Sequence, residues 1–188
     1  MKKLLGILVL IFTLQTPSLA DDIRDFQIEG MSVGDSALDY FSKKKIDSSY
    51  KGFYAKSKKF FYIIIENTKF DLYDNIDFYL KADDKNYKMY GIAGIKRYKL
   101  NSEESYKKCI SKKEEIESYL EKIFPGSEIN KSTWTNSNGS KSIMTDFELD
   151  NGVATIRCII PKISPRGTHI TMISLRLREL AEWHRYAN

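Results

Sequence analysis

The sequence has little of the side-chain chemistry on which metal sites and nucleophilic catalysis usually depend. Its two histidines are His169 and His184, its two cysteines are Cys109 and Cys158, and no pair of these four has a spacing typical of metal ligands. It also lacks a G-x-S-x-G nucleophile elbow and a glycine-rich phosphate loop. We therefore predict no catalytic residue, no metal ligand and no cofactor, and an ordinary packed or exposed role for both histidines.

Acidic and amide side chains do gather in one region, at Asp71, Asp74, Asn75 and Asp77, and two further acids follow at Asp83-Asp84. Oxygen ligands of this kind can hold calcium. The order Asp-x-Asp-x-Asp-Gly of an EF-hand loop is missing, however, and turn formation or solvation explains acids at these positions equally well. We favour turn-forming and solvated acids, with calcium as the alternative.

Long hydrophobic runs are also missing, with one exception at the start of the chain. Two lysines precede an uncharged apolar run of eleven residues, Leu4 to Leu14, and small residues occupy the −3 and −1 positions of a cleavage site that ends at Ala20. Eleven residues are too few to cross a bilayer, which needs about 20. The pattern predicts a signal peptide over residues 1–20, cleaved between Ala20 and Asp21, with no transmembrane segment in the mature chain.

Neither sign of charge is in large excess. Of 30 basic residues, 28 remain when Lys2 and Lys3 leave with the signal, against 25 acidic residues, so the net charge falls from +5 to +3. This mild excess does not argue for nucleic acid as a partner. Residues 43–60 nevertheless hold seven lysines with aromatic residues between them. Contact of Lys43–Lys59 with anionic lipid or another polyanion is one interpretation; we favour a solvated loop or helix with ordinary surface lysines.

The two cysteines lie in segments whose patterns predict a shared core. Residues 102–124 have the spacing of a helix, with Ser102 suited to the N-cap and Pro125-Gly126 at the end. Apolar residues recur there at intervals of three and four and place Cys109 on the buried face. Cys158 faces the core from a predicted strand. We expect a disulfide between them, worth about 4 kcal/mol by the loop-entropy model; two buried free thiols are the alternative.

The strand that carries Cys158 belongs to a predicted hairpin over residues 142–160. Asn151-Gly152 lies between two alternating runs and is a strong signal for a two-residue turn. The predicted pairs are Leu149 with Ala154, Phe147 with Ile156, Thr145 with Cys158 and Ile143 with Ile160 on one face, and Asp146 with Arg157 and Glu148 with Thr155 on the other. The first face is apolar and the second is polar, so the turn and the polarity pattern agree.

The remaining segments complete an α+β pattern. We expect a short helix within Gly30–Phe41, strands within residues 60–65, 76–81, 87–95 and 169–175, and a terminal helix within residues 177–186. The order predicts an antiparallel sheet with a long helix packed on one face, in a single domain over residues 21–188. Both halves have the same element order, which is consistent with two similar helix-plus-sheet halves.

Two stretches resemble known exported proteins. The segment GMSVGDSALDYF, Gly30 to Phe41, resembles the Gly-Met-Ser opening of the first helix in the SmpA/OmlA family of small outer-membrane assembly lipoproteins. The chain lacks the lipid-accepting cysteine of those proteins. More broadly, IRDFQIEGMSVGDSALDYFSKKKI resembles short uncharacterised exported proteins of marine bacteria. The resemblance implies a protein of the bacterial envelope and no particular mechanism.

Export, an aromatic-rich α+β domain and the lack of catalytic motifs favour a non-enzymatic periplasmic or secreted binding protein that acts through an envelope protein partner. One alternative is a small extracytoplasmic hydrolase whose site is assembled from distant residues, with His169 as the candidate. A secreted inhibitor that presents a loop or a sheet face to an enzyme is the other. An exposed apolar and aromatic patch would support the first function, and a deep pocket containing His169 would support the second.

Overall fold

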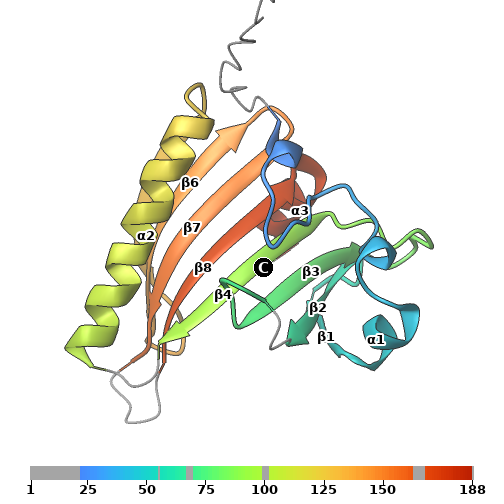
Figure 1. Ribbon diagram of the computed structural model, residues 1–188, viewed down its shortest axis with the longest axis horizontal. Helices are drawn as coiled ribbons and strands as arrows, with labels where there is room; N and C mark the ends of the chain where they lie inside the picture. Colours follow the sequence, from blue (N-terminus) through green and yellow to red (C-terminus); the bar gives the residue numbers. More distant parts are fainter. Residues whose placement is uncertain (1–21, 55, 67–69, 99–101, 163–167, 188) are drawn as a thin grey trace, which may run out of the picture.

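One antiparallel sheet of eight strands dominates the computed structural model, which describes residues 22–54, 56–66, 70–98, 102–162 and 168–187 (Figure 1). The strands are β1 (Tyr50–Phe53), β2 (Phe60–Glu66), β3 (Asn75–Lys81), β4 (Gly91–Tyr98), β5 (Glu128–Thr135), β6 (Lys141–Leu149), β7 (Gly152–Ile160) and β8 (His169–Leu177). The helices are α1 (Lys43–Ser48), α2 (Glu103–Ile123) and α3 (Arg178–Ala187), with 3-10 turns η1 (Ile23–Asp25) and η2 (Ala37–Asp39). The predicted signal peptide and its cleavage site lie outside the described residues.

The strand order β1-β2-β3-β4-β8-β7-β6-β5 results from two meanders that meet at their last strands. Each meander pairs its four strands in sequence, and β4 then pairs with β8 from Gly91–Arg176 to Tyr98–His169. The helix α1 precedes the first meander and α2 precedes the second, so the element order repeats. The predicted α+β class with antiparallel strands is confirmed.

Side chains alternate between two faces of this sheet. The first face carries a buried apolar row that crosses six strands: Ile63, Phe78, Ile92, Leu175, Ala154 and Phe147. The second face carries a polar and aromatic row one residue along: Tyr62, Tyr79, Gly91, Arg176, Val153 and Glu148. The core therefore lies on the first face, where each buried large apolar side chain contributes about 1.5–3 kcal/mol.

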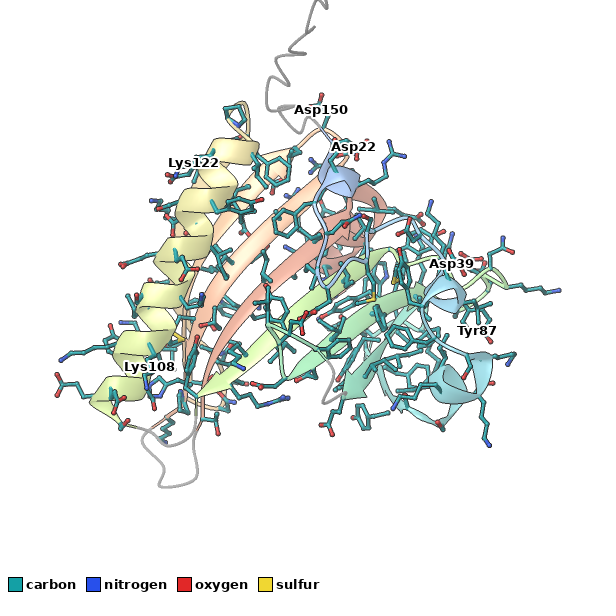
Figure 2. The ribbon with its side chains drawn as sticks, in the orientation of Figure 1. Asp22, Asp39, Tyr87, Lys108, Lys122 and Asp150 are labelled. Atoms are coloured by element: carbon teal, nitrogen blue, oxygen red, sulfur yellow. A yellow bond between two sulfur atoms is a disulfide. The ribbon has the colours of Figure 1, made fainter. Side chains whose placement is uncertain are left out.

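The helix α2 contacts β7 and β8 and begins and ends close to the predicted positions. Ser102 Oγ caps it by accepting from the backbone N–H of Ser105 at 3.1 Å. Leu120 is buried toward the sheet, whereas Lys108 and Lys122 point away from it (Figure 2). Segments from the N-terminal part of the chain complete the same core, with Ile23, Ile28, Met31, Val33 and Ile46 all buried in it.

Cys109 of α2 and Cys158 of β7 form a disulfide, as predicted, with Cα atoms 5.7 Å apart. One turn further along, α2 buries two charged residues that the periodicity did not single out. Lys113 forms an ion pair with Glu117, and its Nζ also donates to Thr145 Oγ1 at 2.9 Å. Because buried charges are tolerated only when they are paired, these contacts fix the orientation of α2 over β6.

The hairpin of β6 and β7 forms, but its turn lies one residue earlier than predicted. Asp150 and Asn151 make the turn, and Leu149 pairs with Gly152. Gly152 belongs to the strand because a Cβ there would lie 2.3 Å from the carbonyl oxygen of Arg176. The pairing slips by two residues, for example to Thr145 with Ile156, so every side chain keeps its predicted face.

The predicted helix within Gly30–Phe41 is replaced by an irregular segment that ends in η2. Gly34 has φ +99°, and its N–H donates to the Met89 carbonyl at 2.8 Å. The Met89 N–H in turn donates to the Asp35 carbonyl at 2.8 Å. These bonds use the backbone groups that a helix would need. The first α-helix comes later, at α1, where the Ser42 hydroxyl provides the cap.

The helix α3 follows β8 directly and lies on the second face, behind the sheet in Figure 1. Leu180 and Ala181 are buried, and Leu180 packs so closely on Gly91 that a Cβ there would lie 2.6 Å from it. Trp183 packs edge-on against Phe60, with ring centroids 5.2 Å apart. In the described part of the chain, no helix has the length and apolar character that crossing a membrane requires.

Candidate functional site

A groove of about 620 Å³ lies on the second face, between α3 and the side of the sheet that β5 and β6 form. Its floor consists of side chains from β6, β7 and β8, chiefly Asp146, Arg157, Met172 and Arg176. Their alternation with the apolar core residues places them on the second face, opposite the apolar row. The groove therefore combines a charged floor with walls from α3 and from the edge strand β5, and we call it the second-face groove.

The two arginines of the floor differ in whether a carboxylate lies close enough to neutralise their charge. Arg176 Nη2 donates to Thr155 Oγ1 at 2.6 Å and lies 3.8 Å from Asp146 Oδ1. Thr155 Oγ1 itself donates to Asp146 Oδ1. For Arg157, the described residues supply no carboxylate within ion-pair distance. Burial, and then the nearby charge of Arg157, lowers the pKa of Arg176.

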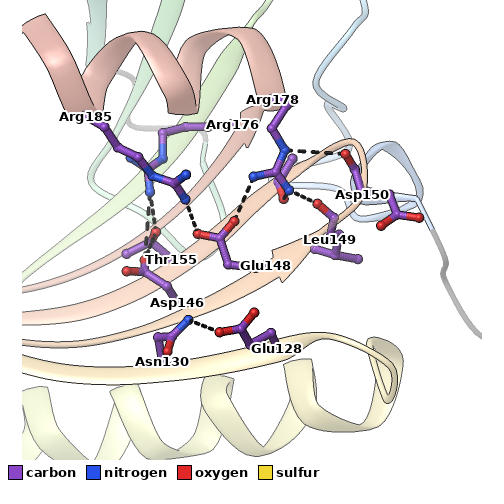
Figure 3. Close-up of polar contacts among 11 residues, drawn as sticks. Glu128, Asn130, Asp146, Glu148, Leu149, Asp150, Thr155, Arg176, Arg178 and Arg185 are labelled. Carbon is purple, nitrogen blue, oxygen red and sulfur yellow. Dashed lines mark hydrogen bonds and ion pairs between the residues drawn. The ribbon is translucent and has the colours of Figure 1, made fainter.

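At one end of the groove, each carboxylate oxygen of Glu148 contacts one arginine (Figure 3). Glu148 pairs with Arg178 at 2.8 Å and with Arg185 on the opposite side. Arg178 also donates to the carbonyls of Leu149 and Gly152, on either side of the β6–β7 turn. These bonds attach α3 to the hairpin, and both oxygens of Glu148 already pair with an arginine other than Arg157.

Aromatic side chains form the wall beneath α3. The Tyr54 hydroxyl and His184 Nε2 are hydrogen-bond partners, and their two rings pack edge-on against each other. The His184 ring also packs edge-on against Tyr79. Burial, and then the charges of Arg176 and Arg157, lowers the pKa of His184 to about 4, so this imidazole is neutral at pH 7. Burial raises the pKa of Tyr79 to about 12. This wall therefore adds polar tips but no charge near neutral pH.

The opposite wall is formed by Trp134 of β5 and Met144 of β6. Trp134 Nε1 lies 3.2 Å from Met144 Sδ, and the indole remains 49% exposed. Every residue of β5 is exposed, as expected for a strand at the edge of a sheet, and Lys131 on its first-face side pairs with Glu117 of α2 at 2.5 Å. A large aromatic and a flexible thioether are thus presented to solvent at the mouth of the groove.

Beyond the groove, on the same face, Asp77 of β3 is only 7% exposed. Its Oδ1 accepts from Asn75 Nδ2 at 2.7 Å, and Arg97 donates to Asn75 Oδ1. Burial raises the pKa of Asp77 to about 6, because the hydrogen bond from Asn75 and the charge of Arg97 offset only part of the cost of desolvation.

The other residues that drew attention in the sequence are dispersed. His169 is buried on the first face, beside the Tyr106 ring at 6.1 Å, and thus on the opposite side of the sheet from the groove. Asp74 accepts from the backbone N–H of Arg97 and lies 3.1 Å from Lys96 Nζ. Within the described ranges, no cluster of histidine, cysteine, aspartate and glutamate side chains is arranged to hold a metal ion.

The lysine-rich segment 43–59 forms α1, β1 and the approach to β2. Several of its charges are compensated: Asp47 pairs with Lys43 and Lys51, and Glu179 of α3 pairs with Lys59. The favoured prediction of a helix or loop with ordinary surface lysines agrees with these contacts. The groove residues Arg157 and Arg176 were not singled out, although the polar face of the predicted hairpin contained Arg157.

The second-face groove combines arginine, aromatic and thioether side chains. Its histidine is neutral and bonded to a tyrosine, its two carboxylates bind arginine or threonine, and Arg157 supplies a positive charge. Arginine, tyrosine, tryptophan and methionine are the residue types that protein interfaces favour.

Comparison of the chain with protein-family models, with curated proteins and with solved structures finds no match.

Proposed function

We propose that this chain is an exported, non-enzymatic binding protein, periplasmic or secreted, which acts through a protein partner that docks in the second-face groove. One observation carries the proposal: Arg157 has no carboxylate partner within the described residues, in a groove lined at its mouth by exposed Trp134 and half-buried Met144. Such arginine and aromatic anchors around a concave surface are typical of the residues that dominate binding energy at interfaces.

The architecture supports this assignment of faces. The proposal takes α2 as the packed cover of the first face, and the two meanders as similar helix-plus-sheet halves joined at β4 and β8. The segments around Ile23 and Ile46 belong to the same core, and a separate groove of about 960 Å³ lies between α2 and residues 24–29. We place the partner in the second-face groove because Arg157 lies there without a carboxylate partner among the described residues.

Crosslinking in the native envelope tests the proposal. A tagged chain is treated with a chemical crosslinker in the cells from which it comes, and captured proteins are identified by mass spectrometry. We expect a dominant protein partner whose recovery falls by about thirtyfold in Trp134→Ala, because an interface anchor contributes about 2 kcal/mol or more. Ile129→Ala is the matched control, since Ile129 is exposed on the same strand but on the opposite face. Equal recovery with both variants would contradict docking in the groove.

Export is tested separately by the intact mass of the protein recovered from the periplasm and from the medium. We expect a chain that begins at Asp21. A chain that retains residues 1–20 and stays inside the cell would contradict the export part of the proposal.

The captured partner also separates the alternatives. An enzyme whose activity falls on binding would identify the inhibitor version of the same docking surface. The hydrolase version uses His169, which lies on the first face beside Tyr106, and therefore predicts that activity survives changes in the groove and disappears in His169→Ala.

A further inference from the structure

The charges of the second-face groove do not balance. Glu148 is paired with Arg178 and Arg185, and Asp146 is shared between Thr155 and Arg176. Nothing among the described residues neutralises Arg157 in the same way. The floor thus offers one full positive charge to whatever enters the groove.

Unused hydrogen-bond donors lie beside that charge. The Nε atoms of Arg157 and Arg176 are both shielded from solvent, and neither has an acceptor within the described chain. A buried donor without an acceptor costs about 1–3 kcal/mol, so both guanidinium groups are held at the groove with part of their hydrogen-bonding capacity unused. The two guanidinium groups come from neighbouring strands of a rigid sheet, with Arg157 opposite Met172 and Arg176 opposite Val153.

The surroundings restrict the kind of anion. Asp146 and Glu148 also line the groove, and their charges oppose a group of high negative charge such as a nucleic acid or a polyphosphate chain. A single carboxylate matches the planar arginine fork and carries only one charge. Trp134 and Met144 at the mouth provide apolar contact for the chain that bears the carboxylate.

Resting on the proposed function, we propose that the groove recognises an acidic segment of the partner protein, with a carboxylate of that segment bound to Arg157 and assisted by Arg176. The apolar side chains beside the carboxylate then lie against Trp134 and Met144. The partner is thus a protein with an exposed segment that combines aspartate or glutamate with apolar residues.

Site-specific photo-crosslinking tests this proposal. The photoreactive residue p-benzoylphenylalanine replaces Ser132, which lines the groove from β5, or Thr133 as the matched control. Thr133 is the next residue on the same exposed strand and faces the opposite side. After irradiation in the native envelope, the partner segment attached to position 132 is sequenced by mass spectrometry. We expect this segment to contain aspartate or glutamate next to apolar residues.

Arginine variants assign the contact to Arg157. In Arg157→Gln we expect the yield at position 132 to fall about tenfold or more, since a hydrogen-bonded charge contact is worth about 1.5–3 kcal/mol. Arg157→Lys restores part of the yield, because it keeps the charge but loses the fork. Arg24→Gln removes the same charge on the first-face side and leaves the yield unchanged. A structural role for Arg157 would lower the thermal stability of Arg157→Gln, whereas loss of a half-buried cation that has no carboxylate partner leaves stability unchanged or higher.

The outcomes separate the two proposals. A neutral or basic segment at position 132, or a wild-type yield in Arg157→Gln, overturns the acidic-segment proposal and leaves docking in the groove intact. Crosslinking at position 132 that does not exceed crosslinking at position 133 overturns the proposed function itself, and the acidic segment with it.

Discussion

Asp77 and His184 respond to pH in opposite directions, although both are packed at the second face. The pKa of Asp77 is raised from 3.8 to about 6, so its stabilising contribution is complete below about pH 4 and is lost as the pH rises through 6. The pKa of His184 is lowered from 6.5 to about 4, so its contribution is complete above pH 6.5 and is lost as the pH falls through 4. Between pH 4 and 6.5 the two effects partly cancel.

The variant Asp77→Asn removes one of these two effects. Each pKa unit corresponds to about 1.4 kcal/mol, so we expect the free energy of unfolding at pH 7.5 to rise by up to about 3 kcal/mol. Asn75 can still donate to the new side-chain oxygen. Between pH 4 and 6 the variant should then gain stability with rising pH more steeply than the wild type. Urea unfolding from pH 4 to 7.5 measures the stability gain and the steeper slope, with the exposed variant Asp83→Asn as control. A pH profile parallel to that of the wild type would contradict the raised pKa of Asp77.

The variant His184→Gln removes the other effect. We expect a loss of about 1 kcal/mol at pH 7.5, since the aromatic contacts with Tyr54, Tyr79 and Trp183 are reduced. The variant should also lose less stability than the wild type as the pH falls from 6.5 to 4. The same urea series detects this change. Acid sensitivity equal to that of the wild type would mean that His184 is not held neutral by its surroundings.

At the scale of elements, the disulfide between α2 and β7 gives a direct prediction. It links residues 49 positions apart. We expect the free energy of unfolding of the double variant Cys109→Ser/Cys158→Ser to be about 4 kcal/mol lower than that of the wild type. Amide exchange should accelerate most in α2, which the bond attaches to the sheet. Guanidinium unfolding with and without reductant measures the loss, and the double variant should be insensitive to reductant. Two free thiols in the denatured, unreduced protein would contradict the bond.

Local signals explain which elements the sequence could predict. Ser102 and Pro125 lie on either side of an amphipathic run, and α2 formed there. The turn of β6 and β7 was displaced because Gly152 is needed beneath Arg176 and Ile23 rather than in the turn, which only tertiary contacts reveal. The segment 30–41 has helical spacing, but Gly34 at positive φ and its bond to Met89 draw it to the sheet instead.

The groove was harder to predict for a related reason. Polar alternation on β6 and β7 marks a face away from the core, and such a face is normally assigned to solvent. Here α3 returns over part of that face, so the Arg176 side chain is only 15% exposed and Arg157 lines the wall of a groove. Similarly, the exposed edge strand β5 contains few apolar residues, and it was missed because a strand that buries nothing has no period-two signal.

At the scale of the whole molecule, the first face joins the two meanders into one core. The buried row from Ile63 of β2 to Phe147 of β6 crosses the β4–β8 seam without interruption. Buried residues of both halves, including Phe78 and Leu175, belong to one apolar cluster with α2 and the N-terminal segments. Such continuity favours cooperative unfolding of both halves together.

The variant Phe147→Ala tests this cooperativity from one side. Phe147 is fully buried on β6, and its truncation should cost about 3–5 kcal/mol because it removes apolar contacts and leaves a cavity. If the two meanders unfold as one unit, slowly exchanging amides of β2 and β3 should lose as much protection as those of β6 and β7. Native-state hydrogen exchange read by mass spectrometry compares the two sets, with Tyr186→Ala, 85% exposed, as the control. Protection that falls in β6 and β7 but persists in β2 and β3 would show that the seam separates two independently stable halves, because the destabilisation would then stop at the pairing of β4 with β8.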